Sequence, residues 1–179
     1  SDQARDALLL AGRIHLFLGR PDDARKSFDR LDVAFSASEH ADSARVDLAT
    51  YLFDRGLFDR AVKAFRTARN RIEDPSLKTK AGLGLADALR HSGDYKAALQ
   101  VYQSLLEPGV GLADNGYDAV RLGLAVTYGH TDRYSAAVNL FLDLIHHSSP
   151  AVRDSDPPGQ PWDTGNTPAT IASSESVVA

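Results

Sequence analysis

Few side chains in this chain have the types and spacing that catalysis or metal binding requires. The 179 residues include six histidines and no cysteine, which excludes thiol nucleophiles, disulfides and cysteine zinc sites. No HExxH or HxH motif, no spaced carboxylate–histidine pair and no GxSxG motif is present. The sequence therefore predicts no catalytic residue, no metal site and no cofactor, and we expect a protein that is not an enzyme.

Two local motifs resemble functional sites without meeting their requirements. His146 and His147 end a predicted helix, where a partly charged imidazole favours the negative end of the helix dipole. A surface metal site is the alternative interpretation of this pair. The segment GLGLAD at 82–87 has the glycines of a phosphate loop, but it lacks a lysine and lies inside a predicted helix. Its glycines indicate close helix packing, or a peptide backbone held in a groove.

The charge balance bears on the class of partner. The net charge is −4 and the pI is near 5.8, whereas a domain that neutralises many phosphates is basic. We therefore expect no nucleic-acid partner. One predicted helix is strongly basic, and its cations are Arg60, Lys63, Arg66, Arg69 and Arg71. They are interpreted as solvated surface, with an acidic protein or an anionic membrane surface as the alternative.

The sequence contains no membrane-spanning or targeting pattern. No run of 18 apolar residues and no signal peptide is found, so we expect no integral membrane segment and a soluble protein of the cytoplasm or periplasm. The chain also has no methionine, so residue 1 is not expected to be the native start.

A motif that returns four times indicates how the chain is organised. In each copy a turn is followed by an aromatic residue or proline, then by an alanine, then by an aromatic residue four positions on. The alanines are Ala24, Ala61, Ala98 and Ala137, which are 37, 37 and 39 residues apart. A second stripe precedes each copy, with a small residue at Gly12, Ala49, Ala86 and Ala125. Spacings of three and four place each stripe on one helix face, so we expect eight helices in four antiparallel pairs.

The predicted division of the chain follows this period. We expect an ordered region at 1–147, with helix pairs at about 4–36, 41–73, 77–107 and 115–147. Residues 148–179 carry five of the eight prolines and many Ser, Thr and Gly residues, too few apolar groups to offset the entropy of ordering. They are interpreted as a tail that is either flexible or docked.

The repeated pattern resembles the tetratricopeptide repeat, whose unit is a helix–turn–helix. The best copy has Ala86, Gly93, Tyr95, Ala98 and Tyr102, and the fourth copy has Asp132 where glycine is usual. The resemblance covers about residues 4–147. It implies an all-α solenoid, a right-handed superhelix whose concave groove binds a segment of a partner protein. The Arg-, Asp- and Ala-rich composition also resembles bacterial repeat proteins of assembly, secretion or regulation.

First helices are expected to line the concave groove, because each pair stacks on the next. Predicted groove residues stand near the small residue of each first helix or close to the rim. They are Leu9, Arg13, Leu16, Val46, Thr50, Phe53, Lys80, Leu83, Asp87, Arg90, His91, Leu122 and Val126. We expect apolar contacts to supply affinity, and Arg13, Asp87 and Arg90 to supply specificity. The subgroup that clamps chaperone C-termini is not matched, since only Lys80 fits its basic positions.

The last predicted helix is apolar over a wide arc. Leu140 and Leu142 flank its central aromatic residue, although a terminal repeat normally has a polar outer face. We expect a cover over these leucines: the tail through Trp162, a further repeat or a second subunit. The simplest alternative is that both pack against their own partner helix.

Three functional hypotheses follow from the sequence. The leading one is a non-enzymatic scaffold that holds a peptide or protein segment in its groove. The second is a self-assembly scaffold that forms a homo-oligomer through Leu140 and Leu142. The third is the repeat region of a larger enzyme whose catalytic domain lies elsewhere.

Overall fold

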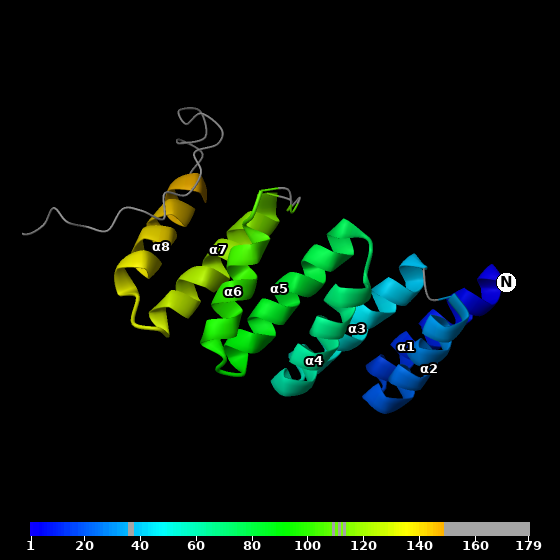
Figure 1. Cartoon of the computed structure of the whole chain (residues 1–179). Coiled ribbons are helices and arrows are strands. Elements are labelled where there is room, and N and C mark those ends of the chain that lie inside the picture. The colour runs from blue at the N-terminus through cyan, green and yellow to red at the C-terminus, as the bar shows by residue number, and fades with distance from the viewer. Residues whose placement is uncertain (36–37, 109, 111, 113, 149–179) are drawn as a thin grey trace, which may run out of the picture.

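The computed structural model describes residues 1–35, 38–108, 110, 112 and 114–148. The predicted tail, including Trp162, lies outside these residues. In the described part the chain forms the eight helices that the sequence predicts (Figure 1). They are α1 (Asp2–Phe17), α2 (Pro21–Phe35), α3 (Glu39–Asp54), α4 (Phe58–Arg71), α5 (Pro75–His91), α6 (Tyr95–Leu105), α7 (Asp114–Gly129) and α8 (Tyr134–Ser148).

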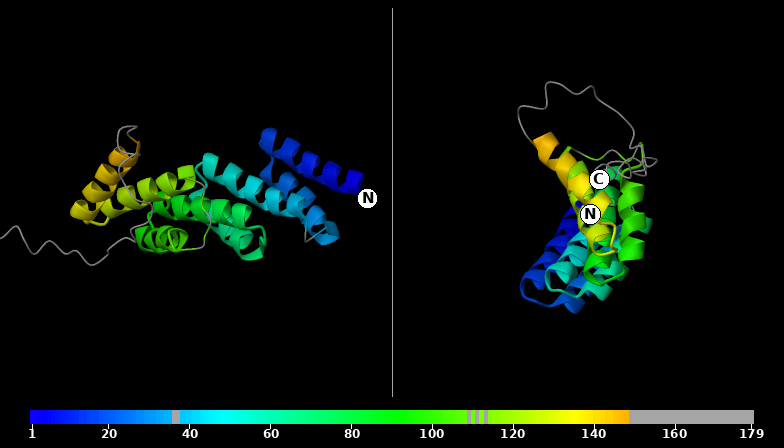
Figure 2. Two further views of the ribbon diagram at one scale, coloured as in Figure 1. Left: turned by 90° about the horizontal axis from the view of Figure 1, so that it is seen from above. Right: turned by 90° about the vertical axis from the view of Figure 1, so that its left-hand side faces the viewer.

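The helices form pairs that follow one another along an elongated array (Figures 1 and 2). α1 packs on α2, α3 on α4, α5 on α6 and α7 on α8, and each second helix also packs on the first helix of the next pair. The prediction of an all-α helical solenoid is confirmed. The division of 1–147 into four repeat units at the stated boundaries stays a prediction of the sequence.

Turns within the pairs share one backbone conformation. Gly19, Gly56 and Gly93 have φ between 72° and 88°, and Asp132 has φ 59°. The next residue closes each turn by donating its N–H back to the helix, as from Asp94 to the carbonyl of Leu89 at 2.9 Å. Glycine adopts this left-handed conformation without steric cost, which explains its position in three of the four turns.

Helix starts are marked by capping side chains. Asp74 precedes α5 and accepts a hydrogen bond from the N–H of Leu77, while Pro75 occupies the first turn. Asp94 precedes α6 and accepts from the N–H of Ala97. These bonds satisfy amide groups that have no partner inside the helix, so capping residues in the sequence mark where α5 and α6 begin.

Junctions between the later pairs depend on a ring that lies on a helix backbone. The ring of Phe65 in α4 lies against Gly84 in α5, and a Cβ built on that glycine would come within 2.4 Å of it. The ring of Tyr102 in α6 lies against Gly123 in α7 in the same way, at 2.5 Å. Both rings are buried, because glycine leaves room for them.

The first junction is built differently, with ion pairs. α3 has Asp47 at the position of these glycines, and the ring of Phe28 lies over Gly12 of its own pair instead. Arg45 of α3 forms an ion pair with Asp32 of α2, and Asp32 also pairs with Arg71 of α4. The buried apolar residues of the first pair form a cluster with Ala41 and Ala44 of α3, which is distinct from the main one.

The glycine junction can be tested with two substitutions of the same kind. We expect Gly84→Ala to lower the free energy of unfolding by about 1–2 kcal/mol. Overpacking costs about 1–3 kcal/mol, and the better helix propensity of alanine returns at most about 1 kcal/mol.

Gly129→Ala is the matched control, because a Cβ at that glycine meets nothing within 4 Å. It should leave stability unchanged or raise it by up to about 1 kcal/mol. Urea denaturation followed by circular dichroism measures both values. Equal stability of the Gly84→Ala variant and the natural chain would contradict the proposed close contact with Phe65.

Candidate functional site

Successive first helices lie beside one another, whereas successive second helices do not. α1 approaches α3, α3 approaches α5 and α5 approaches α7 backbone to backbone. The described second helices meet only through long side chains, such as Arg60 of α4 and Asp22 of α2. In a curved array, helices on the inner side lie closer together than helices on the outer side. We therefore call the surface formed by α1, α3, α5 and α7 the inner face (Figure 2).

Three of the predicted groove residues do not reach this face. Leu9 and Leu16 are buried in the core of the first pair, and Val46 is buried in the main core. Their assignment to the groove is wrong. In α1 and α3 these positions face neighbouring helices, so the two leucines and the valine stabilise the stack.

Arg13 links two first helices across the inner face. Its Nε lies 2.7 Å from Oδ2 of Asp47, and its Nη2 donates to Oγ of Ser43 at 3.0 Å. Neither partner was among the predicted groove residues. Ser43 has the same place in α3 as Lys80 has in α5, six residues before the small residue, and this offset could have revealed it. Lys80 itself is exposed.

Asp87 and Arg90, predicted as specificity residues, are joined to Tyr102. The Tyr102 hydroxyl donates to Oδ1 of Asp87 at 2.6 Å, and Nε of Arg90 donates to that hydroxyl at 3.4 Å. Burial and the charge of Asp87 raise the pKa of Tyr102 well above its ordinary value, so the phenol stays protonated as the donor. Asp87 and Arg90 remain partly exposed and can each contact a ligand.

His91 belongs to a group of aromatic rings. Its imidazole stacks on Phe58 with centroids 4.9 Å apart, and it forms a T-shaped contact with Phe53, with centroids 5.3 Å apart. Arg90 donates to Nε2 of His91 at 3.0 Å, which requires a neutral imidazole. Burial and the charge of Arg90 lower the pKa of His91. The structure thus brings together Phe53 and His91, which the sequence predicted separately.

The remaining predicted groove residues differ in exposure. Thr50, Leu83 and Val126 are half-buried, and Leu83 packs against the main core. Leu122 is exposed in the first helix of the last pair. The inner face is therefore more polar along α1, α3 and α5 than the sequence predicts.

Leu140 and Leu142 of α8 do not form one surface. Leu140 is buried and belongs to the main core, so the expectation that it awaits a cover is wrong. A residue three positions after Ala137 faces the partner helix, as the simplest interpretation held. Leu142 is exposed. The proposed contact with Trp162 lies outside the described residues.

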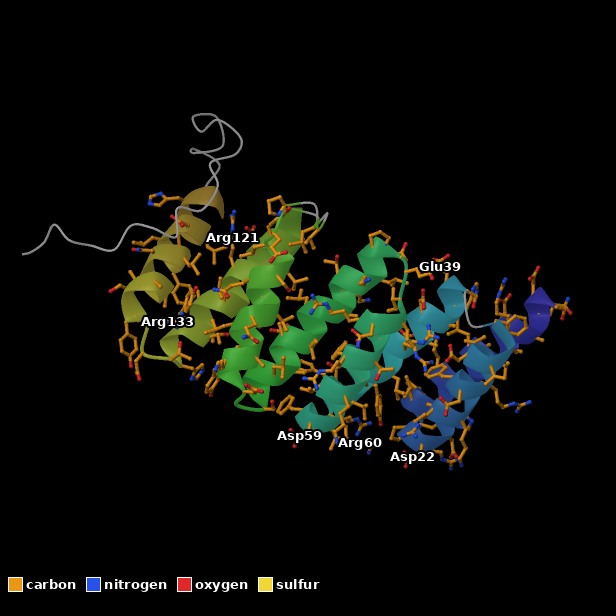
Figure 3. The ribbon with its side chains drawn as sticks, in the orientation of Figure 1. Asp22, Glu39, Asp59, Arg60, Arg121 and Arg133 are labelled. Atoms are coloured by element: carbon orange, nitrogen blue, oxygen red, sulfur yellow. The ribbon has the colours of Figure 1, made fainter. Side chains whose placement is uncertain are left out.

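A pocket of about 390 Å³ opens on the outer side between α2 and α4, with α3 contributing its inner wall. Arg60 and Arg71 of the basic helix line it, together with Lys63. Arg60 pairs with Asp22 at 3.2 Å, at the edge of the array shown in Figure 3, and Arg71 pairs with Asp32. These ion pairs neutralise much of the local charge, so the basic helix holds neighbouring pairs together.

Comparison with protein families decides the classification. Sequence models of the tetratricopeptide repeat match residues 6–35 and 46–116, together more than half of the chain. The chain belongs to the tetratricopeptide repeat family. The resemblance inferred from the repeated motif is thereby confirmed. A search of curated proteins gives no significant match.

Tetratricopeptide repeats are generally protein–protein interaction modules, and proteins built from them are typically non-catalytic scaffolds. Across the described residues, no helix has both the length and the apolar character needed to cross a membrane. In the same residues, no three His, Asp or Glu side chains are grouped as metal ligands. A protein partner is the class of ligand that this family membership supports.

The hydroxyl of Tyr102 should stabilise this tetratricopeptide repeat array. We expect Tyr102→Phe to lower the free energy of unfolding by about 1–2 kcal/mol, because the carboxylate of Asp87 loses a charge-assisted hydrogen bond. Tyr134→Phe is the control, since the Tyr134 hydroxyl bonds an exposed carboxylate, that of Asp132. Its effect should stay below about 0.5 kcal/mol. Urea denaturation compares the two, and equal effects would contradict a special role for Tyr102.

His91 should make the stability of the array depend on pH. Because its pKa is lower in the folded state than in the unfolded state, the unfolded chain binds the proton more readily. The contribution of the neutral His91 to the free energy of unfolding is fully present above the ordinary histidine pKa, about 6.5. It is lost as the pH drops below that value.

We expect the melting temperature of the natural chain to fall more between about pH 7.5 and 5.5 than that of His91→Phe, which keeps a ring but cannot titrate. Circular dichroism at several pH values measures the difference. Parallel curves for the two proteins would show that His91 does not contribute.

Proposed function

We propose that the inner face binds an extended segment of a partner protein that carries charges of both signs. One observation supports this most directly. Arg13, Thr50 and Asp87 each follow the small residue of α1, α3 and α5, and all three side chains are exposed or half-buried. A row of polar side chains repeated from helix to helix matches the regular spacing of an extended peptide.

The charges on the inner face define the ligand. Lys80 is exposed and has no ion-pair partner among the described residues, so it is available to an acidic side chain. Asp47 and Asp87 already pair with Arg13 and Arg90 and have further lone pairs for a basic side chain. Exposed pairs of this kind contribute little stability, so exchanging them for contacts to a ligand costs little.

The apolar part of the interaction is smaller than the sequence suggested. With Leu9, Leu16 and Val46 in the core, the predicted apolar contacts that remain on this face are the exposed Leu122 and half-buried side chains such as Leu83 and Val126. We therefore assign most of the recognition to hydrogen bonds and charge, and infer a reversible interaction in place of a permanent one.

In this role the protein acts as a non-enzymatic scaffold. The bacterial assembly, secretion or regulatory role stays a prediction of the sequence, as does the alternative of a repeat region attached to a catalytic domain. Self-assembly through α8 loses one of its two predicted contacts, because Leu140 is buried. The inner face is accordingly the better-supported binding surface.

Peptide selection tests the inner face without knowledge of the partner. A displayed library of random 12-residue peptides is selected on the full chain, and the affinities of the selected peptides are measured by fluorescence anisotropy. We expect Lys80→Glu to weaken binding about tenfold, because an attraction becomes a repulsion, which corresponds to about 1.4 kcal/mol. Peptides reselected on this variant should exchange an acidic residue for a basic one.

The matched control is Arg66→Glu, which makes the same charge change at an exposed position of the second helix α4. It should leave the affinities within about twofold, a difference of less than 0.5 kcal/mol. Peptides that lose affinity equally for both variants would indicate a general charge effect. If only Arg66→Glu weakened peptide binding, the binding surface would lie on the outer side of the array and not on the inner face.

A further inference from the structure

One apolar surface of the array has no cover among the described residues. On α8, Tyr134 is 62% exposed, Val138 53% and Phe141 37%, and Ile145 is also exposed. These residues are spaced by four, three and four positions, so they lie on one side of the helix. Together with Leu122 of α7 we call them the end surface.

The same positions are covered in the earlier second helices. Phe65 and Tyr102 correspond to Phe141 in the repeated motif, and they are 3% and 0% exposed. Val62 and Leu99 correspond to Val138 and are both buried. The side chains of α8 therefore match one side of an interface that the chain forms twice, between α4 and α5 and between α6 and α7.

The covering helix has a defined chemistry in both cases. A glycine, Gly84 or Gly123, lies under the central ring and lets the helices approach. Seven residues later a histidine stacks on the ring at the start of the second helix. His91 lies 4.9 Å from Phe58, and His130 lies 4.7 Å from Tyr95, between ring centroids.

The two covering helices share the sequence pattern GLAxxxxH, at 84–91 and at 123–130. No other glycine in the chain is followed by a histidine seven residues later. Tyr134 stands where Phe58 and Tyr95 stand in their helices, so the end surface presents the aromatic half of this contact without the helix that completes it.

We propose that the end surface binds an α-helix of a partner protein, with a small residue opposite Phe141 and a histidine or aromatic ring seven residues later opposite Tyr134. This helix takes the place of a further first helix. The exposure of Leu122 supports the same geometry, because Val46 at the corresponding position of α3 is buried in the main core. Apart from Leu122, the end surface lies on α8, outside the inner face, and the proposal does not depend on the proposed function.

A second copy of the chain fits this surface poorly. Its exposed first helix, α1, has Leu10 at the position of the glycine, where a side chain would meet the ring of Phe141. Phe28 avoids this problem at the first junction by lying over Gly12 of its own pair, but Phe141 has Ala125 at that place. Residues 149–179 are also unsuited, because they contain five prolines, which interrupt a helix.

A peptide taken from the protein itself serves as the probe. Labelled residues 74–92, which include the Asp74 cap, are titrated with the full chain and followed by fluorescence anisotropy. We expect saturable binding that weakens at least tenfold with Phe141→Asp in the chain, and equally with Gly84→Leu in the peptide. Val33→Asp is the control, because Val33 is an exposed valine on α2, outside the end surface.

An isolated helix of this length folds only partly in water, so a second measurement presents the helix within the chain. A copy of residues 72–107 is inserted between Ser148 and Ser149 of the full chain. Hydrogen exchange of residues 134–146 should slow at least tenfold compared with the same insertion carrying Gly84→Leu. Equal exchange in the two proteins would overturn the proposal.

The other occupants give different results. A dimer of the free chain that is lost with Phe141→Asp in sedimentation would assign the surface to a second copy and overturn the proposal. Peptide binding that appears only after removal of residues 149–179 would assign it to the tail, with the same consequence. Binding unaffected by Phe141→Asp would place the peptide elsewhere.

Discussion

The array depends on the cover that each helix pair receives from the next. A single pair leaves the central ring of its second helix against solvent, and the following first helix buries it only where its backbone comes close enough. Gly84 and Gly123 allow that approach over Phe65 and Tyr102. Stability is consequently shared between neighbouring pairs.

The first junction shows what happens when the glycine is absent. Asp47 stands at that position, Phe28 turns towards Gly12, and the less exposed ion pair of Arg45 with Asp32 joins α2 to α3 beside apolar packing. Ion pairs between helices stay close to solvent, because burying a charge costs free energy unless pairing and hydrogen bonds offset its desolvation. The polar character of the inner face near α1 and α3 is thus a consequence of how these two pairs are joined.

Packing and recognition are connected at the third pair. Tyr102 places its ring in the core and its hydroxyl beside Asp87 and Arg90, and Arg90 in turn fixes His91 among aromatic rings. The side chains that face a ligand are therefore held by bonds to a buried residue. Such support limits their rotamers, which reduces the entropy that binding must overcome.

The sequence by itself determined the period, the eight helices, the turns and the family, because these depend on local spacing, capping and left-handed glycines. Only the tertiary structure decided which apolar residues face which neighbour. Leu9, Val46 and Leu140 have the pattern of helix-face residues, yet a helix inside the array, such as α3, contacts its partner, the previous pair and the next pair at once. Helical periodicity identifies the apolar positions, but the distribution of those positions among three neighbours is set by contacts between residues far apart in the chain.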